Sequence, residues 1–538
     1  MKQLKQAHAQ MITSNLAQEP YALSRLMAHF SLDPTPSALA HSLLLFDHIQ
    51  RPTICIYNTM IKALLLHNHF IHTLQIYGRM LVHGHRPDHY TLPSLFKACA
   101  SLQDSQMGDR IHALSLKLGL ASDIFVANAL IQMSVCCGDL IGARKVFDEM
   151  PLRSEVSWTV LISGYAKRGE VEIARQLFDE APVKDRGIWG AMISGYVQNN
   201  CFKEGLVMFR MMQLADLEAD EAVLVSVLCA CGQLGALDVG LWVHGYVERV
   251  GLRLGVRLGT ALVDMYTKCG SLGLAKKVFD EMRDRDSVCW NVMIMGLGVH
   301  GDGEGAFELF EGMQKAGFRP DDVTFIAIFT ACNHSGMVCE GLREFGRMWE
   351  VYGIEPKGEH FGCVVDFLGR AGLFEEAMGV IRRIPASTSP LEEAIAWRAL
   401  LSACWNHGET QLAEVAADRL VQLERHSGVY VLMSNIYAAN GKFIDARRIR
   451  NMMKDRGVEK TPGCSSIEHT NLIYQKSLRH NKQKHEFLEF RLPCSFLAFT
   501  YKYYSNELQN EVCFSSASHS GNSGFQDVFT MKNEALTI

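Results

Sequence analysis

The sequence has few features of a membrane protein, a disulfide scaffold or a metalloprotein. None of its apolar runs approaches the roughly eighteen residues that a membrane-spanning helix needs. It contains 16 cysteines but no Cys-x-x-Cys pair, and no secretory signal opens it. We therefore expect reduced, buried thiols, no metal or other cofactor, and no contact with a membrane. The formal net charge is −5, so any binding to nucleic acid has to depend on local groups rather than on bulk charge.

The first twenty residues also lack strong signals. They contain no acidic residue before Glu19, no arginine and few serines. An amphipathic helix of this kind is compatible with an organellar transit peptide, but the missing arginine favours an ordinary first helix of the fold.

The chain does contain an internal repeat. Three near-copies, ARKVFDEMP (143–151), ARQLFDEAP (174–182) and AKKVFDEMR (275–283), start 31 and then 101 residues apart. Extending this register divides the chain without gaps, through Lys357, into units of 31, 35 or 36 residues. The units start at Ile54, His89, Ile124, Glu155, Arg186, Glu221, Val256, Ser287 and Asp322.

Each unit has the pattern of two short helices. In the unit from Glu155, one apolar face contains Trp158, Leu161, Ile162 and Tyr165, spaced as on one side of a helix. The KRGE stretch then interrupts the pattern, and a second apolar face follows. A hairpin of this size cannot bury its apolar face unless it stacks on its neighbours. The sequence therefore predicts an all-α fold, a right-handed α-solenoid superhelix of stacked helix-turn-helix repeats.

One stretch, MGLGVHGDG, has the spacing of a dinucleotide-binding loop, with Gly296, Gly298 and Gly301. In the repeat register, however, Gly301 is the fifteenth residue of its unit. The same slot, between the two helices, holds Gly138, Gly169 and Gly270. We therefore predict helix before the glycines and a turn at Gly301, not a nucleotide-binding loop.

Other possible sites of chemistry also follow the register. Cys99, Cys231 and Cys332 are each the eleventh residue of a unit, which indicates core packing rather than metal binding. The lone His407-Gly408-Glu409 is half of a zinc deaminase signature, but no Cys-x-x-Cys follows it, so a turn is the better interpretation. We predict no catalytic residue and no enzymatic activity.

The units YNTMI…HRPD and NALIQM…CCGDLIGARKVFDEMP resemble the repeats of plant pentatricopeptide repeat proteins. The resemblance is to the class that alternates 35-residue P, 35–36-residue L and 31-residue S motifs, here 54–88, 89–123 and 124–154. It implies degenerate repeats over 1–53, nine repeats over 54–357 and a final S-type repeat over 358–389. Two E motifs over 390–460 and the start of an E+ segment at 461–468 follow. Residues 469–538 correspond to nothing in the family, and we expect a divergent tail and no DYW deaminase domain.

In this family the fifth and last residues of each repeat select one RNA base. The resemblance implies that Asn58 with Asp88, and Asn291 with Asp321, select U. It implies that Asn128 with Ser154 selects a pyrimidine, C being favoured, and that Thr159 with Asp185, and Thr260 with Asp286, select G. Gly190 has no selecting side chain, and Pro93, Val225 and Ile326 in the L motifs offer no amide or hydroxyl. With RNA parallel to the chain, the predicted target of the nine repeats is 5′-U-n-C-G-n-n-G-U-n-3′.

The E motifs favour one function, a site-recognition factor for organellar C-to-U RNA editing. Such a chain would bind single-stranded organellar RNA and recruit a DYW-type deaminase in trans, with other editing factors, through its E motifs. The expected location is a mitochondrion or a chloroplast, the mitochondrion being favoured. The alternatives are an RNA-binding factor for splicing, transcript stability or translation, a helical scaffold that binds only proteins, and a decayed gene product.

Overall fold

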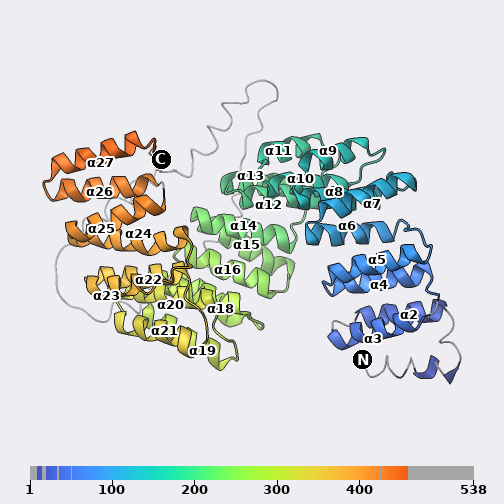
Figure 1. The fold of residues 1–538 in the computed structure, drawn as a ribbon, viewed down its shortest axis with the longest axis horizontal. Coiled ribbons are helices and arrows are strands. Elements are labelled where there is room, and N and C mark those ends of the chain that lie inside the picture. Colours follow the sequence, from blue (N-terminus) through green and yellow to red (C-terminus); the bar gives the residue numbers. More distant parts are fainter. Residues whose placement is uncertain are drawn as a thin grey trace, which may run out of the picture. The chain divides into compact units, whose positions relative to one another are not determined.

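A computed structural model of the protein describes residues 6, 9–11, 13–14, 20–32, 35–49, 51–424 and 426–458. Within these ranges the chain forms helices and turns and no strand, so the predicted all-α solenoid class is confirmed (Figure 1). No helix in them has the length and apolar character needed to cross a bilayer. The predicted E+ segment at 461–468, the tail at 469–538 and most of the first nineteen residues lie outside the described residues.

The even-numbered helices are the first helices of successive hairpins. They are α2 (Pro20–Leu32), α4 (Ile54–Leu66), α6 (Thr91–Leu102), α8 (Ile124–Cys137), α10 (Glu155–Lys167), α12 (Arg186–Gln198), α14 (Glu221–Leu234), α16 (Val256–Lys268), α18 (Ser287–Val299), α20 (Asp322–Ser335), α22 (Gly358–Arg370), α24 (Pro390–His407) and α26 (Ser427–Ala439).

The odd-numbered helices are the second helices of the same hairpins. They are α3 (Pro36–His48), α5 (Phe70–Val82), α7 (Ser105–Lys117), α9 (Leu140–Glu149), α11 (Val171–Glu180), α13 (Phe202–Leu214), α15 (Leu237–Val250), α17 (Leu272–Glu281), α19 (Gly303–Lys315), α21 (Val338–Glu350), α23 (Phe374–Ile381), α25 (Thr410–Leu423) and α27 (Phe443–Asp455).

The two sets of helices pack differently. Each first helix contacts the first helix of the next hairpin, from α2 to α26. The second helices pack mainly on first helices, and single side-chain contacts link some neighbouring second helices, such as the ion pair between Arg79 of α5 and Asp47 of α3 at 2.8 Å. The first helices therefore form one continuous layer in which equivalent side chains of neighbouring repeats lie in a row.

The turn between the two helices explains the recurring glycine. Gly301 has φ +82°, in the left-handed region that favours glycine, and the equivalent Asn200 has φ +58°. The two other glycines of the nucleotide-like motif lie inside α18. A Cβ added at Gly298 would be 2.9 Å from the Cα of Ala331, and one added at Gly296 would be 2.4 Å from the side chain of Thr267. The prediction of helix followed by a turn at Gly301 is confirmed, and the other two glycines serve close helix packing.

The repeated FDE sequence builds an aromatic pair across each junction between an S repeat and its successor. The phenylalanine of one second helix meets the tryptophan of the next first helix edge to face, with ring centroids 4.8–4.9 Å apart. The three pairs are Phe147–Trp158, Phe178–Trp189 and Phe279–Trp290. The Arg285 guanidinium lies 4.5 Å from the Phe279 ring centre and donates hydrogen bonds to two carbonyls at the end of α17. These contacts tie neighbouring hairpins together.

The cysteines that follow the register are packing residues. Cys99, Cys231 and Cys332 are buried on first helices, and burial raises the pKa of each thiol to about 12. A thiol with so high a pKa stays protonated and is a poor metal ligand or nucleophile. Among the described residues, no group of histidine, cysteine and carboxylate side chains is arranged to hold a metal ion.

Candidate nucleic-acid interface

The last residue of several predicted repeats lies just before the next first helix and caps it. Asp185, Asp286 and Asp321 each accept a hydrogen bond from a backbone N–H of the first turn, at 2.8–2.9 Å. Ser154 does the same with Ser157 at 3.3 Å. Because all these residues have extended backbone and act as N-caps, their side chains are held at equivalent places along the layer of first helices.

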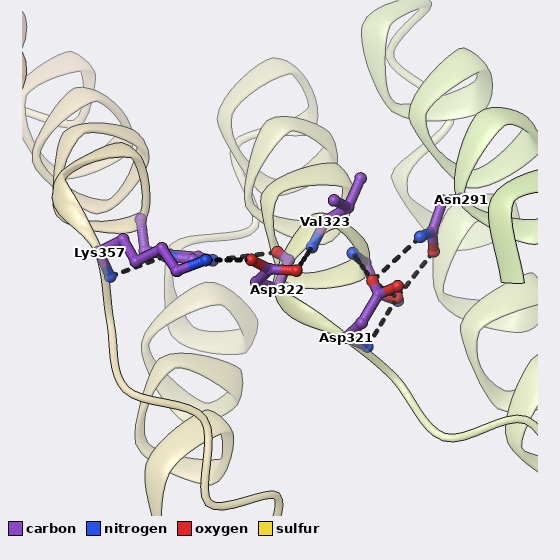
Figure 2. Close-up of polar contacts among 7 residues, drawn as sticks. Asn291, Asp321, Asp322, Val323 and Lys357 are labelled. Carbon is purple, nitrogen blue, oxygen red and sulfur yellow. Dashed lines mark hydrogen bonds and ion pairs between the residues drawn. The ribbon is translucent and has the colours of Figure 1, made fainter. Parts of the chain in front are cut away.

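Two of the predicted selecting pairs are joined directly. The Asn58 Nδ2 donates to Asp88 at 3.1 Å, and the Asn291 Nδ2 donates to Asp321 at 3.0 Å. Figure 2 shows Asn291 and Asp321 facing each other across the junction between α18 and α20. The structure therefore brings together side chains 30 residues apart in sequence, as the repeat register predicts.

A threonine completes both pairs. Thr91 and Thr324, each the third residue of the following repeat, donate from their hydroxyls to the amide oxygens of Asn58 and Asn291, at 2.6 and 2.7 Å. Both threonines are fully buried. With its oxygen held by threonine and its nitrogen held by aspartate, the amide has only one orientation, and its remaining N–H and lone pair point in a defined direction.

Sequence reasoning missed this third residue. A signal was present, because a polar side chain three residues after an N-cap can hydrogen-bond back to it and complete a capping box, and Asp321 with Thr324 forms one. The third residue of a repeat also lies next to the fifth residue of the preceding repeat elsewhere in the chain. A Cβ added at Gly190, a fifth residue, would lie 3.2 Å from the side chain of Val223, the third residue of the next repeat.

The two oxygens of Asp321 have different roles. Oδ1 accepts from the Thr324 backbone N–H and the Asn291 amide. No described residue donates a hydrogen bond to Oδ2, which leaves it for a donor on a ligand. The position at the N-terminus of α20 also stabilises the negative charge.

The equivalent Asp88 is held in its ionised form. Burial would raise the pKa of this carboxyl, but hydrogen bonds from Thr91, Tyr90 and Asn58 outweigh it and lower the pKa. At neutral pH the side chain is therefore a carboxylate that accepts hydrogen bonds and donates none.

Thr159 and Asp185 lie close together without a mutual hydrogen bond. A Cβ added at Gly187 would be 3.3 Å from the Thr159 hydroxyl and 3.4 Å from an Asp185 carboxylate oxygen, so both groups lie close to this glycine. In the free protein the Thr159 hydroxyl donates to the Glu155 carbonyl at 2.9 Å. Its lone pairs remain able to accept from a ligand.

The two other predicted pairs are not joined. Within residues 51–424, no hydrogen bond connects Asn128 to Ser154 or Thr260 to Asp286. The Asn128 amide oxygen is buried without a hydrogen-bond partner. The Thr260 hydroxyl has no oxygen or nitrogen partner, and its polar neighbour is the Cys289 thiol. These selecting groups are thus less constrained than those of Asn58 and Asn291.

A row of exposed apolar side chains runs beside the selecting pairs, and sequence reasoning did not single it out. These residues occupy the second slot of their repeats, on the first turn of a first helix or just before it. They are Tyr90, Phe125, Val156, Val288 and Val323. The sequence carried a signal, since Val156 lies off the apolar face formed by Trp158 and Leu161. Nucleobases can stack on aromatic side chains such as Tyr90 and Phe125, and the valines offer an apolar contact in the equivalent slots.

Replacing Thr324 by valine tests the amide lock. The variant keeps the shape of the buried side chain but removes the hydroxyl that donates to Asn291. We expect discrimination between U and C at the eighth RNA position to fall about tenfold, the value of one buried hydrogen bond of ~1.4 kcal/mol. Gel shifts with the two RNAs measure it.

Thr330→Val is the matched control for Thr324→Val. It lies on the same helix, and its hydroxyl donates within α20, to the Ile326 carbonyl at 2.8 Å. The ratio of affinities for U and C should stay unchanged in this control. An unchanged ratio in Thr324→Val as well would show that the threonine does not orient Asn291.

Comparison with protein families finds three matching models. The PPR repeat family model matches residues 52–101 and 285–334. The PPR repeat model matches residues 125–154, 156–184, 187–217 and 260–287. The E motif model matches residues 407–468.

Similar proteins cover most of the chain. Pentatricopeptide repeat-containing protein At2g20540 of Arabidopsis thaliana is 40% identical over 88% of this chain and 87% of its own length. At2g22410, mitochondrial, of the same family and organism, is 37% identical over 91% and 87%, and At2g02980, chloroplastic, is 35% identical over 88% and 73%. Among solved structures, the pentatricopeptide repeat protein PPR10 from maize matches 84% of this chain and 71% of its own, with a TM-score of 0.50 and 14% identity, which is a likeness of fold.

Proposed function

The chain belongs to the pentatricopeptide repeat family, and from this premise we propose that it binds single-stranded organellar RNA in a sequence-dependent manner. Repeats of this family read about one base each through two or three side chains. The observation that carries the proposal is the pair of amide–carboxylate contacts, Asn58 with Asp88 and Asn291 with Asp321, each completed by a threonine.

The chemistry of these pairs explains how a base is selected. U carries N–H at ring nitrogen N3, and G carries it at N1, in the middle of the edge used for base pairing. A carboxylate accepts from that N–H, whereas C and A present a lone pair at the same place and leave the carboxylate unpaired. The fifth residue of the repeat then distinguishes pyrimidines, which have one ring, from purines, which have two. This supports the predicted target 5′-U-n-C-G-n-n-G-U-n-3′ for the nine repeats.

We further assign the protein to C-to-U RNA editing, as the factor that marks the edited site. The E motif match at 407–468 supports this assignment. In this proposal the repeats hold the transcript, and the E motifs recruit a DYW-type deaminase in trans. An organelle is supported by the names of the relatives, one mitochondrial and one chloroplastic.

Sequencing of organellar transcripts in plants that lack this protein tests the editing role. We expect one or a few C-to-U events to disappear, each beside a stretch that matches the predicted target. Editing should return when the wild-type chain is restored. Intact editing together with altered splicing, abundance or translation of a transcript would instead support the alternative role in RNA processing. Failure to bind any RNA would favour a protein-binding scaffold.

A further inference from the structure

One repeat carries a cation in the slot where six of the eight preceding repeats carry an aspartate. The last residue of the unit from Asp322 is Lys357, and it precedes α22. Its backbone is extended, with φ −95° and ψ 171°, close to that of Asp286 with φ −108° and ψ 176°. Lys357 therefore leaves the chain at the same place and in the same direction as the acidic selecting residues, but it presents an ammonium group.

The ammonium lies across the junction between α20 and α22. Lys357 Nζ forms an ion pair with Asp322, the first residue of α20, one junction away from Asn291 and Asp321 (Figure 2). The side chain is 61% exposed, and the exposed Val323 follows Asp322 on α20. The ion pair thus holds the cation at the surface, and an exposed apolar side chain follows its partner Asp322 in the chain.

Neither Ile326 nor His360 competes with the ammonium for a ligand at this junction. The fifth residue of the unit, Ile326, has no hydrogen-bonding group. His360 is fully buried and accepts from the Lys357 backbone N–H at 3.0 Å, while its other ring nitrogen lies 3.0 Å from the Asp322 carbonyl. Burial lowers the pKa of His360, so the ring is neutral and points into the protein.

Hydrogen-bond polarity then indicates the base. A carboxylate in the last slot accepts from the central N–H of U or G. Cytosine N3 and adenine N1 have no hydrogen at this place and can only accept. We infer that Lys357 selects a base with an unprotonated central ring nitrogen, C or A, at the ninth position of the target. This inference depends on the proposed RNA binding.

A contact to a backbone phosphate is the competing use of an exposed lysine. Such a contact is independent of the base and weakens with salt. The last-slot position, the ion pair that holds the ammonium at the junction and the neighbouring Val323 favour a base contact. The inference predicts C or A at the ninth nucleotide of the target. The apolar Ile326, in the fifth slot of the same repeat, predicts no base there.

Gel shifts with four RNAs that differ only at the ninth nucleotide test the inference on the full chain. We expect C and A to bind about fivefold to tenfold more tightly than U and G, the value of about one hydrogen bond. Lys357→Met should abolish this preference and keep the length of the side chain. Lys315→Met is the matched control, because Lys315 is an exposed lysine on second helix α19 paired with Glu311, and it should keep the preference.

The outcomes separate this inference from the proposed function. Equal binding of the four RNAs, or a preference for U or G, would overturn the inference. So would an equal loss for all four RNAs in Lys357→Met, since that result identifies a phosphate contact. In each of these cases a retained preference for U at the eighth position would leave the proposed RNA binding intact, whereas no preference at any position would refute the proposed function itself.

Discussion

Replacing both guanosines of the predicted target by adenosine should weaken binding by about 100-fold. The two positions face Thr159 with Asp185 and Thr260 with Asp286. Adenine N1 has a lone pair where guanine N1 has a hydrogen, so each carboxylate would lose its donor. One mismatched hydrogen-bonded base costs on the order of 1–3 kcal/mol, and 1.4 kcal/mol is a factor of ten. A gel shift at fixed salt concentration measures the difference.

The same prediction can be reversed from the protein side. Thr260→Asn changes a predicted G reader into the Asn–Asp combination seen at Asn291 and Asp321. We expect this variant to prefer a pyrimidine, U, at the seventh RNA position. Thr410→Asn, at the start of α25 outside the nine repeats, should leave the preference for G unchanged. Equal binding of the original and substituted RNAs by the wild-type chain would refute the base assignments.

The second large effect concerns stability. Phe279→Ala should lower the free energy of unfolding by about 3–5 kcal/mol, the usual cost of deleting a buried phenylalanine. Phe279 is 2% exposed, packs edge to face on Trp290 and lies under the Arg285 guanidinium. Because repeat arrays are stabilised by interfaces between neighbours, the loss at the junction of α17 and α18 should also split unfolding into two steps. Urea denaturation followed by circular dichroism measures both.

Phe443→Ala is the control for this experiment. Phe443 is 71% exposed at the start of α27, so its removal should change stability by no more than about 0.5 kcal/mol. Similar denaturation curves for the two variants would show that the aromatic pair does not hold the junction.

Much of the architecture follows from local sequence. The apolar spacing around Trp158 and the recurring turn glycine such as Gly301 predict helix pairs, since helix periodicity and positive φ are local properties. The same register places Asn58 and Asp88 in equivalent slots, which is why their pairing could be expected. The predicted division into segments and the base assignments remain predictions.

By itself the sequence determined the repeat register, the all-α class and the polar character of each selecting slot, because these depend on spacing along one chain segment. Only the tertiary structure decided which selecting groups are locked. The hydroxyl of Thr324 meets Asn291 across 33 residues, and Lys357 meets Asp322 across 35. Such contacts depend on how closely two first helices pack, to within a fraction of an ångström, and spacing along the chain carries no information about that distance.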